Sequence, residues 1–345
     1  MADSLLFLAL KGHSKQLTLS NKNLVTIPKL IGKLDFVCQL QLKNNKIKTL
    51  PSELCNLHQL QSLNLGNNNL EEFPPILQHL PSLQRLHLFG NNITIIDGIS
   101  LNGFKQLTFL NLNGNKLKHL PKEICNLSRI QHLSIDNNQL TEIPVEFCAL
   151  ITLQEFHAAG NCLVSLPLEM GYLVNLEKLY LQKNKIRELP ESLGKCYKLR
   201  YLDVAANELR IFPTELSSLP LKELYCEENP LLNNIPVHSV QEEEVLSLKE
   251  LCARFVMQEL KDRWSSMRKA LRFYPDIRNM LAQSSKCALC GAPFLNTWLE
   301  CVKFVDAKKD LKLVSMSGPI PVRALLCSYK CFNSTGHSYY GVAFP

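Results

Sequence analysis

The sequence predicts an α/β solenoid of about ten 23-residue repeats in a right-handed horseshoe, with a C-terminal helical cap and a small cysteine-bearing module. Three observations support this fold class. An asparagine recurs every 22 to 24 residues between positions 45 and 229, and a proline follows it in nearly every copy. The pattern then stops before a basic tail that contains paired cysteines. A fixed period of this length indicates stacked repeats, each in contact only with its neighbours.

Each repeat carries the pattern L-x-L-x-x-N-x-L, in which alternate leucines of a short strand point into a shared core. The asparagine suits the turn after the strand, because its amide both donates and accepts hydrogen bonds and can satisfy buried backbone groups. The proline fixes φ and ends strand pairing, which sends the chain around the convex side in short helical turns. The first copy is degenerate and carries Lys22 at the asparagine position. The repeating asparagines are Asn45, Asn68, Asn91, Asn115, Asn138, Asn161, Asn184, Asn207 and Asn229.

These repeats resemble the leucine-rich repeat family. The resemblance implies an α/β leucine-rich-repeat solenoid, and the proline-bearing 23-residue form is similar to the repeats of cytoplasmic signalling scaffolds. One copy departs from the pattern, with Asp97 where proline is expected and an extra residue in DGISLNGF. We interpret this departure as an insertion tolerated on the convex side, with a recognition bulge as the alternative.

The predicted sheet presents one long concave face. Nine strand spacings of about 4.8 Å give a face about 43 Å long, which suits a protein partner that buries roughly 800 Å² per side better than a small molecule. Exposed aromatic side chains on this face are candidate interface anchors, and aromatic residues scattered as on any surface are the alternative. The predicted partner-binding residues are Arg85, His87, Phe89, Phe109, Asn111, His132, Ser134, Glu155, His157, Lys178, Tyr180, Tyr201, Asp203 and Tyr225.

Several function classes are not expected from this sequence. It shows no glycine-rich phosphate loop, nucleophile elbow or paired-carboxylate site, so we expect a protein that is not an enzyme. No apolar run approaches 18 residues, and we expect neither a membrane-spanning segment nor a membrane partner. Thirteen cysteines, most of them isolated, indicate a reducing compartment, which is the cytoplasm with the nucleus as a second option.

The net charge of +7 comes entirely from the last hundred residues. Residues 246–345 contain 15 Lys and Arg against 7 Asp and Glu, which leaves 23 against 24 in the first 245 residues. Such an excess is compatible with a nucleic-acid partner. We expect a solvated helical face instead, because acidic residues are interspersed and aromatic residues are not regularly interleaved.

Short helices are predicted after the repeats. The acidic turn at 241–244 suits a helix N-terminus, where the macrodipole favours negative charge, and the apolar residues that follow recur at helical spacing. A second helical stretch runs from Trp264 to Tyr274, and a third begins at Pro275. These helices would cap the open end of the solenoid, which every repeat array requires.

The first of these helices also resembles the BC box, by which substrate receptors of cullin–RING ubiquitin ligases dock onto Elongin C. Leu248, Cys252 and Val256 are four residues apart, so they share one helix face, and the small thiol allows close approach. Tyr274 and the proline after it resemble the start of a cullin box, although Arg278 stands where an apolar residue is expected. The resemblance implies Elongin B–Elongin C and a cullin as partners; a simple cap is the alternative.

Four cysteines near the C-terminus have the spacing of metal ligands. Cys287 and Cys290 lie in C-x₂-C-G, where the glycine permits a tight turn, and Cys327 and Cys331 follow after 36 intervening residues. Four soft thiolates favour a tetrahedral Zn²⁺ without an open position, which makes the predicted ion structural. The alternative is four reduced thiols in a core. Predicted strands between the two pairs indicate a zinc-ribbon-like module.

The predicted domains are an N-terminal cap at 1–15, leucine-rich repeats at 16–238, a helical cap with the BC-box-like helix at 239–284, and the four-cysteine, zinc-ribbon-like module at 285–345. Two functions are compatible with this organisation. The first is an intracellular, non-catalytic scaffold that binds a protein on its concave face. The second is a ubiquitin-ligase substrate receptor, in which the bound protein is the substrate and residues 247–256 recruit Elongin.

Overall fold

The structure is a computed structural model, and it forms two compact units. The first unit comprises Met1–Leu209, Ser217–Pro230 and Lys312–Met316, and the second comprises Arg210–Leu216, Leu231–Leu311 and Ser317–Pro345. The residues that the structure describes are 2–232, 246–295, 299–313, 315, 318–334 and 336–341.

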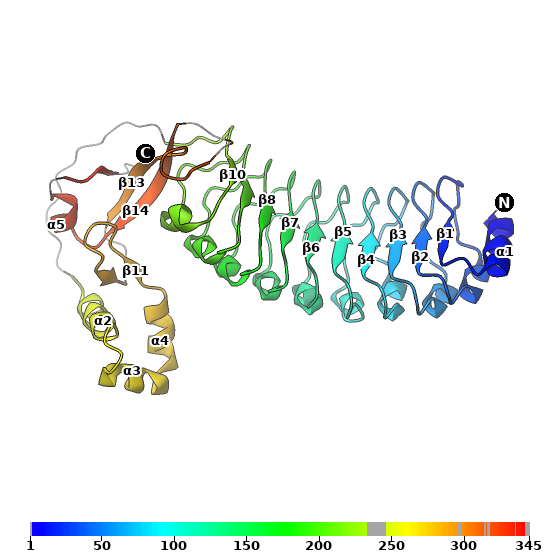
Figure 1. Ribbon diagram of the computed structural model, residues 1–345, viewed down its shortest axis with the longest axis horizontal. Helices are drawn as coiled ribbons and strands as arrows, with labels where there is room; N and C mark the ends of the chain where they lie inside the picture. Colours follow the sequence, from blue (N-terminus) through cyan, green and yellow to red (C-terminus); the bar gives the residue numbers. More distant parts are fainter. Residues whose placement is uncertain are drawn as a thin grey trace. The chain divides into compact units, whose positions relative to one another are not determined.

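The first unit is built on one parallel sheet of ten three-residue strands in sequence order, which confirms the predicted repeat architecture (Figure 1). Neighbouring strands pair at the repeat spacing, as when Leu63 lies between Leu40 and Leu86. The central residue of every strand is buried, whereas its two neighbours in most strands stay partly exposed, because side chains alternate along a strand. The strands are Gln16–Thr18 (β1), Gln39–Gln41 (β2), Ser62–Asn64 (β3), Arg85–His87 (β4), Phe109–Asn111 (β5), His132–Ser134 (β6), Glu155–His157 (β7), Lys178–Tyr180 (β8), Tyr201–Asp203 (β9) and Glu223–Tyr225 (β10).

A short 3-10 helix follows each strand from β1 to β9, and most of these helices begin directly after a proline in extended conformation. In the irregular repeat Asp97 replaces the proline and caps the helix, because its carboxylate accepts a hydrogen bond from Ile99 N at 3.2 Å. A Cβ on Gly103 would collide with the carbonyl of Gln78, so the extra residue is accommodated only with a glycine there. The 3-10 helices are Lys29–Lys33, Ser52–Asn56, Pro75–His79, Gly98–Leu101, Lys122–Asn126, Val145–Ala149, Leu168–Tyr172, Glu191–Lys195 and Thr214–Ser218.

The repeating asparagines satisfy buried backbone groups as predicted, and together they form a buried ladder. Asn138 donates through Nδ2 to Leu112 O at 3.1 Å and to Ile135 O at 2.9 Å, and its Oδ1 accepts from Leu117 N at 3.1 Å. Equivalent bonds recur from Asn45 to the last repeat. Each amide therefore links its own turn to the turn of the preceding repeat.

A second ladder lies at the exposed residue just before the buried asparagine. Asn67 Nδ2 donates to Asn44 Oδ1 at 2.8 Å, and Asn44 Nδ2 donates to Asn21 Oδ1 at 3.0 Å. These residues have positive φ, which asparagine and glycine tolerate better than other residues do. In later repeats the same conformation is imposed on Lys183 and Ala206, with φ of 58° and 52°.

Both ends of the sheet are covered within the first unit. The helix α1 (Ala2–Gly12) lies at the β1 end, where Leu6 is fully buried. At the other end Ser315 pairs with the outer edge of β10, because its Oγ accepts from Leu224 N at 3.1 Å and donates to Leu224 O at 3.0 Å. A free strand edge would otherwise leave these backbone groups open to pairing with another chain.

The second unit combines short helices with two small antiparallel sheets. Its larger sheet has the order β14-β13-β15, and β14 also bonds to Phe212, whose N donates to Pro321 O at 2.9 Å. The predicted acidic turn at 241–244 lies outside the described residues, and α2 begins with Ser247 as its N-cap. The elements are α2 (Leu248–Glu259), α3 (Ser266–Ala270), a 3-10 turn at Leu271–Phe273, α4 (Pro275–Ala282), β11 (Ser285–Lys286), β12 (Pro293–Phe294), β13 (Leu299–Asp306), β14 (Pro319–Leu326), α5 (Tyr329–Phe332) and β15 (Tyr339–Gly341).

Candidate functional site

The first and third residues of the strands β1–β10 form what we call the sheet face, and an aromatic ladder crosses its last four strands. His157 stacks on Tyr180 with ring centroids 4.1 Å apart and an interplanar angle of 12°. Tyr201 lies 4.7 Å from Tyr180 and 5.4 Å from Tyr225, measured between ring centroids. The rings hold one another in place from four separate strands, so they form one continuous aromatic surface.

A second aromatic group lies on the preceding strands. Phe109 is 4.8 Å from His87 and 6.1 Å from His132 between ring centroids. Phe89 lies two residues beyond β4 and its ring covers Gly66, where an added Cβ would collide with it. The glycine in the neighbouring repeat therefore makes room for this ring.

Charged groups are concentrated around Glu155, whose side chain is half-buried. Its carboxylate contacts His157 Nε2 at 2.8 Å, His132 Nδ1 at 3.4 Å and Lys178 Nζ at 3.4 Å. Burial alone would raise the pKa of Glu155, but the hydrogen bond from His157 and the charge of Lys178 lower that pKa below its ordinary value. Glu155 therefore stays ionised and orients the side chains around it.

Three carboxylates lie close to the ladder, of which the sequence analysis predicted Asp203 and missed Asp136 and Glu223. Burial raises the pKa of Asp136, which lies 3.8 Å from His157 Nδ1. Burial also raises the pKa of Asp203, and Glu223 accepts a hydrogen bond from the Tyr225 hydroxyl at 2.9 Å, which raises the pKa of Tyr225 to about 12. The signal for Asp136 was available, because it lies two residues past a strand on the same side as the predicted residues.

The remaining predicted residues of the sheet face differ in their solvent exposure and in their hydrogen bonds. Arg85 is exposed at the start of β4. Ser134 is buried, and its hydroxyl donates to Asn113 Oδ1 at 2.7 Å, while Asn111 Oδ1 accepts from Asn113 N at 2.9 Å. Asn111 and Ser134 thus stabilise the sheet face through local hydrogen bonds, and the rings and charged groups provide its accessible surface.

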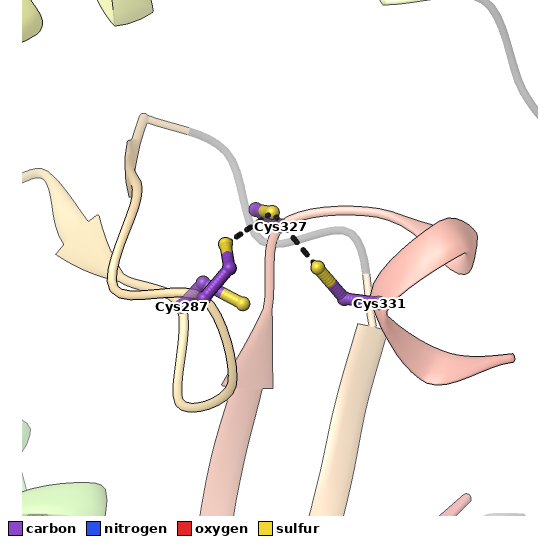
Figure 2. A group of neighbouring side chains, drawn as sticks. Cys287, Cys327 and Cys331 are labelled. Atoms are coloured by element: carbon purple, nitrogen blue, oxygen red, sulfur yellow. Dashed lines mark hydrogen bonds between the residues drawn. The ribbon is translucent and has the colours of Figure 1, made fainter. Parts of the chain in front are cut away.

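In the second unit the structure brings all four predicted cysteines together. The sulfur atoms of Cys287, Cys290, Cys327 and Cys331 all lie within 4.8 Å of one another, and Figure 2 shows the three labelled thiols converging. Two separations are 3.5 Å, from Cys290 to Cys327, and 3.6 Å, from Cys327 to Cys331. A tetrahedral ion with metal–sulfur bonds of about 2.3 Å places its sulfurs about 3.8 Å apart. The cluster could therefore bind a metal ion.

Local structure explains how these thiols converge. Cys287 and Cys290 lie in the turn between β11 and β12, where Gly291 has a φ of 68° and donates to Cys287 O at 3.0 Å. Burial raises the pKa of Cys331. At Cys287 burial acts in the same direction, but backbone N–H groups of Cys290, Cys327 and Leu289 outweigh it and lower the pKa to about 7. The turn thus favours a thiolate at Cys287, the form that binds metals.

The helix α2 has the opposite orientation from the one that its apolar pattern suggests. Its buried residues are Glu250, Ala253 and Met257. Leu248 is 76% exposed and Cys252 is also exposed, whereas Val256 is only partly exposed and packs against the small core of the helices. The apolar stripe of α2, extended by Leu251 and Phe255, thus faces solvent.

A buried carboxylate explains this orientation. Glu250 is fully buried, and its Oε1 accepts from Arg254 Nε at 2.6 Å and from Leu295 N at 3.0 Å. Arg254 also donates to Cys327 O at 2.8 Å. These bonds connect α2 to the segments that carry the cysteines, and they turn the Glu250 side of the helix inward.

Family models and relatives agree with this fold. Models described as Leucine Rich repeats (2 copies) match residues 81–122 and 174–220, and a Leucine Rich Repeat model matches 59–80 and 129–150. Together with the ten-stranded sheet, these matches define a leucine-rich repeat protein. The chain belongs to the family of leucine-rich repeat-containing protein 69, because it is 62% identical over 343 residues to that protein from Xenopus laevis, with 99% of each chain covered. The protein of that name from Homo sapiens is 43% identical over 123 residues, which are 36% of this chain and 35% of the human one.

Solved structures share the repeat fold. The plant peptide hormone receptor RGFR1 in complex with RGF2 superposes with a TM-score of 0.53 and 30% identity, covering 59% of this chain and 34% of the receptor. A TDR receptor gives 0.54 and 29%, covering 63% and 43% respectively. The chain thus spans less than half of either receptor. The family is usually non-catalytic and no catalytic domain is identified, and no helix in the described ranges has the length and hydropathy to cross a membrane.

Proposed function

We propose that this protein is a non-catalytic interaction scaffold that binds a protein partner on the sheet face. The observation that carries this proposal is the aromatic ladder His157–Tyr180–Tyr201–Tyr225, which is one continuous surface of side chains that the repeat core does not need. Tyrosine supplies a large contact area at a small cost in conformational entropy. Because neighbouring rings already restrain one another, less entropy is lost when a partner covers them.

The neighbouring charges add specificity to this surface. Glu155 is already engaged by Lys178 and His157, whereas Asp203 and Glu223 border the tyrosines without a basic partner among the contacts of the described residues. Charges at the rim of an interface govern the choice of partner and the association rate more than affinity. Similarity to the repeat region of a receptor solved with a bound peptide hormone supports a peptide or protein as the ligand class.

The test is a double change in the ladder, Tyr180→Ala with Tyr201→Ala. Its matched control is Tyr172→Ala with Tyr197→Ala, which removes two exposed tyrosines from the 3-10 side of the repeats. Quantitative crosslinking mass spectrometry in cells would identify partners of the wild-type protein. We expect the main partner to be lost from the ladder variant and retained by the control. Retention of that partner by a folded ladder variant would remove the site from the sheet face.

A second candidate function is supported by the exposure of α2. Leu248 and Cys252 are exposed on the helix that resembles the BC box, and solvated apolar side chains of this kind are typical of helix-in-groove recognition. We propose that this face recruits Elongin B–Elongin C and through it a cullin, with the protein on the sheet face as the ubiquitylation substrate. Val256, the third residue of the motif, packs against the helical core and would hold this side of α2 in place.

Co-purification with recombinant Elongin B–Elongin C tests this second function. The variant Leu248→Ser with Cys252→Asp should lose the complex, and Phe273→Ser, which changes another exposed apolar side chain of the same unit, should keep it. Failure of folded wild-type protein to bind would leave α2 without this role. Binding that survives the double change would place the contact elsewhere.

We propose that the four cysteines bind a structural Zn²⁺. Four sulfur donors close around one point fit this ion, leave it no open position, and can contribute about 10–16 kcal/mol to the folding of a small module. From the cysteine usage of the sequence we also propose a reducing location, cytoplasmic or nuclear. Staining for the tagged protein in fractionated cells tests the location.

A further inference from the structure

One surface of the second unit is separate from the exposed face of α2 and from the cysteine cluster. It is the segment 261–274, here called the α3 tip, which contains α3 and connects α2 to α4. Its helical turns lie at the end of the helix group farthest from β13 and β14 (Figure 1). The tip exposes three aromatic side chains: Trp264 is 89% exposed, Phe273 is 81% exposed and Tyr274 is 57% exposed.

Other apolar residues attach the tip to the helical core. Met267 and Leu271, four residues apart, are partly buried, and Leu271 packs against the small core that includes Met257 and Leu281. Trp264 precedes α3, and Phe273 and Tyr274 follow it, so none of the three rings belongs to the helix itself. All three stay exposed, although their apolar character alone would predict burial.

The tip is also strongly basic. Residues 261–274 contain five Lys and Arg against one Asp, a net charge of +4. All five cations are exposed, and within the described ranges none of them forms an ion pair, while Arg268 donates to Leu260 O at 2.6 Å. The five are Lys261, Arg263, Arg268, Lys269 and Arg272.

We propose that the α3 tip docks on an anionic lipid surface. Exposed tryptophan and phenylalanine rings favour the interface between lipid headgroups and acyl chains. Clustered Lys and Arg are attracted to the negative potential of membranes that contain acidic lipids. Exposed rings and cations on short helical turns suit a bilayer surface, whereas single-stranded nucleic acid is usually held in a basic groove. The proposal departs from the sequence-based expectation of no membrane partner, which was based on the lack of a long apolar run. Docking on a surface requires no membrane-spanning segment, so it is compatible with the absence of one among the described helices.

Vesicle binding by the full-length protein tests the proposal. The two probes are phosphatidylcholine vesicles and phosphatidylcholine vesicles with added phosphatidylserine. Binding should require phosphatidylserine and weaken at least tenfold when the salt concentration is raised through the physiological range, because screening shortens the reach of surface charges. Equal binding to both vesicle types would overturn the proposal.

Charge-reversal variants locate the contact. Arg268→Glu with Arg272→Glu should weaken binding to the phosphatidylserine vesicles at least tenfold. The matched control, Lys308→Glu with Lys309→Glu, makes the same charge change at exposed positions in the turn after β13 and should keep most of the binding. An equal loss in both variants would mean that net charge and not the tip determines binding, and it would contradict the proposal.

The fluorescence of Trp264 provides a readout that separates lipid from nucleic acid. The chain has two tryptophans, so Trp298→Phe leaves Trp264 as the only tryptophan that is excited at the red edge of the protein absorption band. We expect its emission to shift to the blue with phosphatidylserine vesicles and to be quenched by brominated acyl chains. Unchanged emission would refute insertion of the ring. Tight binding to single-stranded RNA without quenching by brominated lipid would identify a nucleic-acid surface instead.

Discussion

Replacing Asn138 by alanine tests the account of what holds the repeats together. Its side chain makes hydrogen bonds to four backbone groups of this repeat and the preceding one, at Leu112, Leu117, Ile135 and Asp136. Alanine keeps the backbone conformation accessible but removes the donors and the acceptor. The change therefore isolates the contribution of one member of the buried ladder.

The expected magnitude follows from the groups that lose their partners. The backbone N–H of Leu117 is buried and has no other acceptor among the hydrogen bonds of the described residues. Leaving this N–H without an acceptor costs about 1–3 kcal/mol. The carbonyls of Leu112 and Ile135 lose a donor as well, with a smaller penalty because a carbonyl left without a donor is tolerated somewhat better than an orphaned amide. We expect a total loss of about 3 kcal/mol in the free energy of unfolding.

Urea unfolding followed by circular dichroism measures this loss. The matched control is Gln139→Ala, because Gln139 is the next residue and its side chain is exposed. The control should change the free energy of unfolding by no more than about 0.5 kcal/mol. If Asn138→Ala were as stable as the control, the buried asparagines would not be the element that stabilises the turns, and the physical account of the repeat would be wrong.

Four further predictions concern other parts of the molecule. Cys290→Ser, or treatment with a strong chelator, should release one equivalent of zinc and melt the cysteine module; a metal-free protein with that module intact by NMR would exclude a structural ion. Zinc affinity, measured against a competing chelator, should fall as the pH drops through about 7, because protonation of Cys287 removes a thiolate whose pKa is lowered to about 7. Ala206→Asn should stabilise the repeats by about 1 kcal/mol, since alanine is strained at its positive φ and asparagine tolerates it; no gain in the urea midpoint would contradict this. Glu250→Gln should destabilise the second unit by about 3 kcal/mol, because Arg254 keeps its charge without a buried counter-charge, and thermal unfolding of the variant tests this.

The repeat region was predictable because its rules are local and periodic. A leucine pattern of period two identifies each strand, the asparagine identifies the turn that follows, and the proline identifies the start of the 3-10 helix. The exception at Asp97 was recognisable as well, since aspartate caps a helical turn where proline would have begun one. Repetition then supplies the tertiary contacts, because each repeat packs on copies of itself.

Hydrophobic periodicity alone could not decide the orientation of α2, for which the sequence left a docking face and a capping face open. Hydrophobic periodicity assigns Leu248, Cys252 and Phe255 to the inner side of a helix, and the structure exposes all three. The inner side is set by Glu250, whose burial depends on an arginine one turn later and on the amide of Leu295, 45 residues away. A pattern of polarity along one helix does not contain such a long-range bond, so periodicity alone does not decide which side of the helix faces solvent.

The candidate sites were predictable as residues but not as arrangements. The cysteine spacing identified Cys287 and its three partners as one set of metal ligands, because two closely spaced cysteine pairs, one of them with a glycine turn, are typical of zinc sites. On the sheet face the strand pattern identified Tyr180 and Tyr201, yet the ring contacts and the carboxylates beside them depend on side-chain conformations. Partner identity depends on those details, so the sequence indicates an interaction face and no particular partner.

The two proposed surfaces differ in charge, and this difference makes their ligands separable by experiment. Glu155, Asp203 and Glu223 on the sheet face repel an anionic surface, whereas the α3 tip attracts it with a net charge of +4. Contacts through aromatic burial depend weakly on ionic strength, and contacts through exposed charges depend on it strongly. Raising the salt concentration should therefore release the tip from vesicles while a protein held on the tyrosine ladder stays bound. Release of both ligands over the same range of salt would mean that charge, and not the stacked rings, dominates the sheet face.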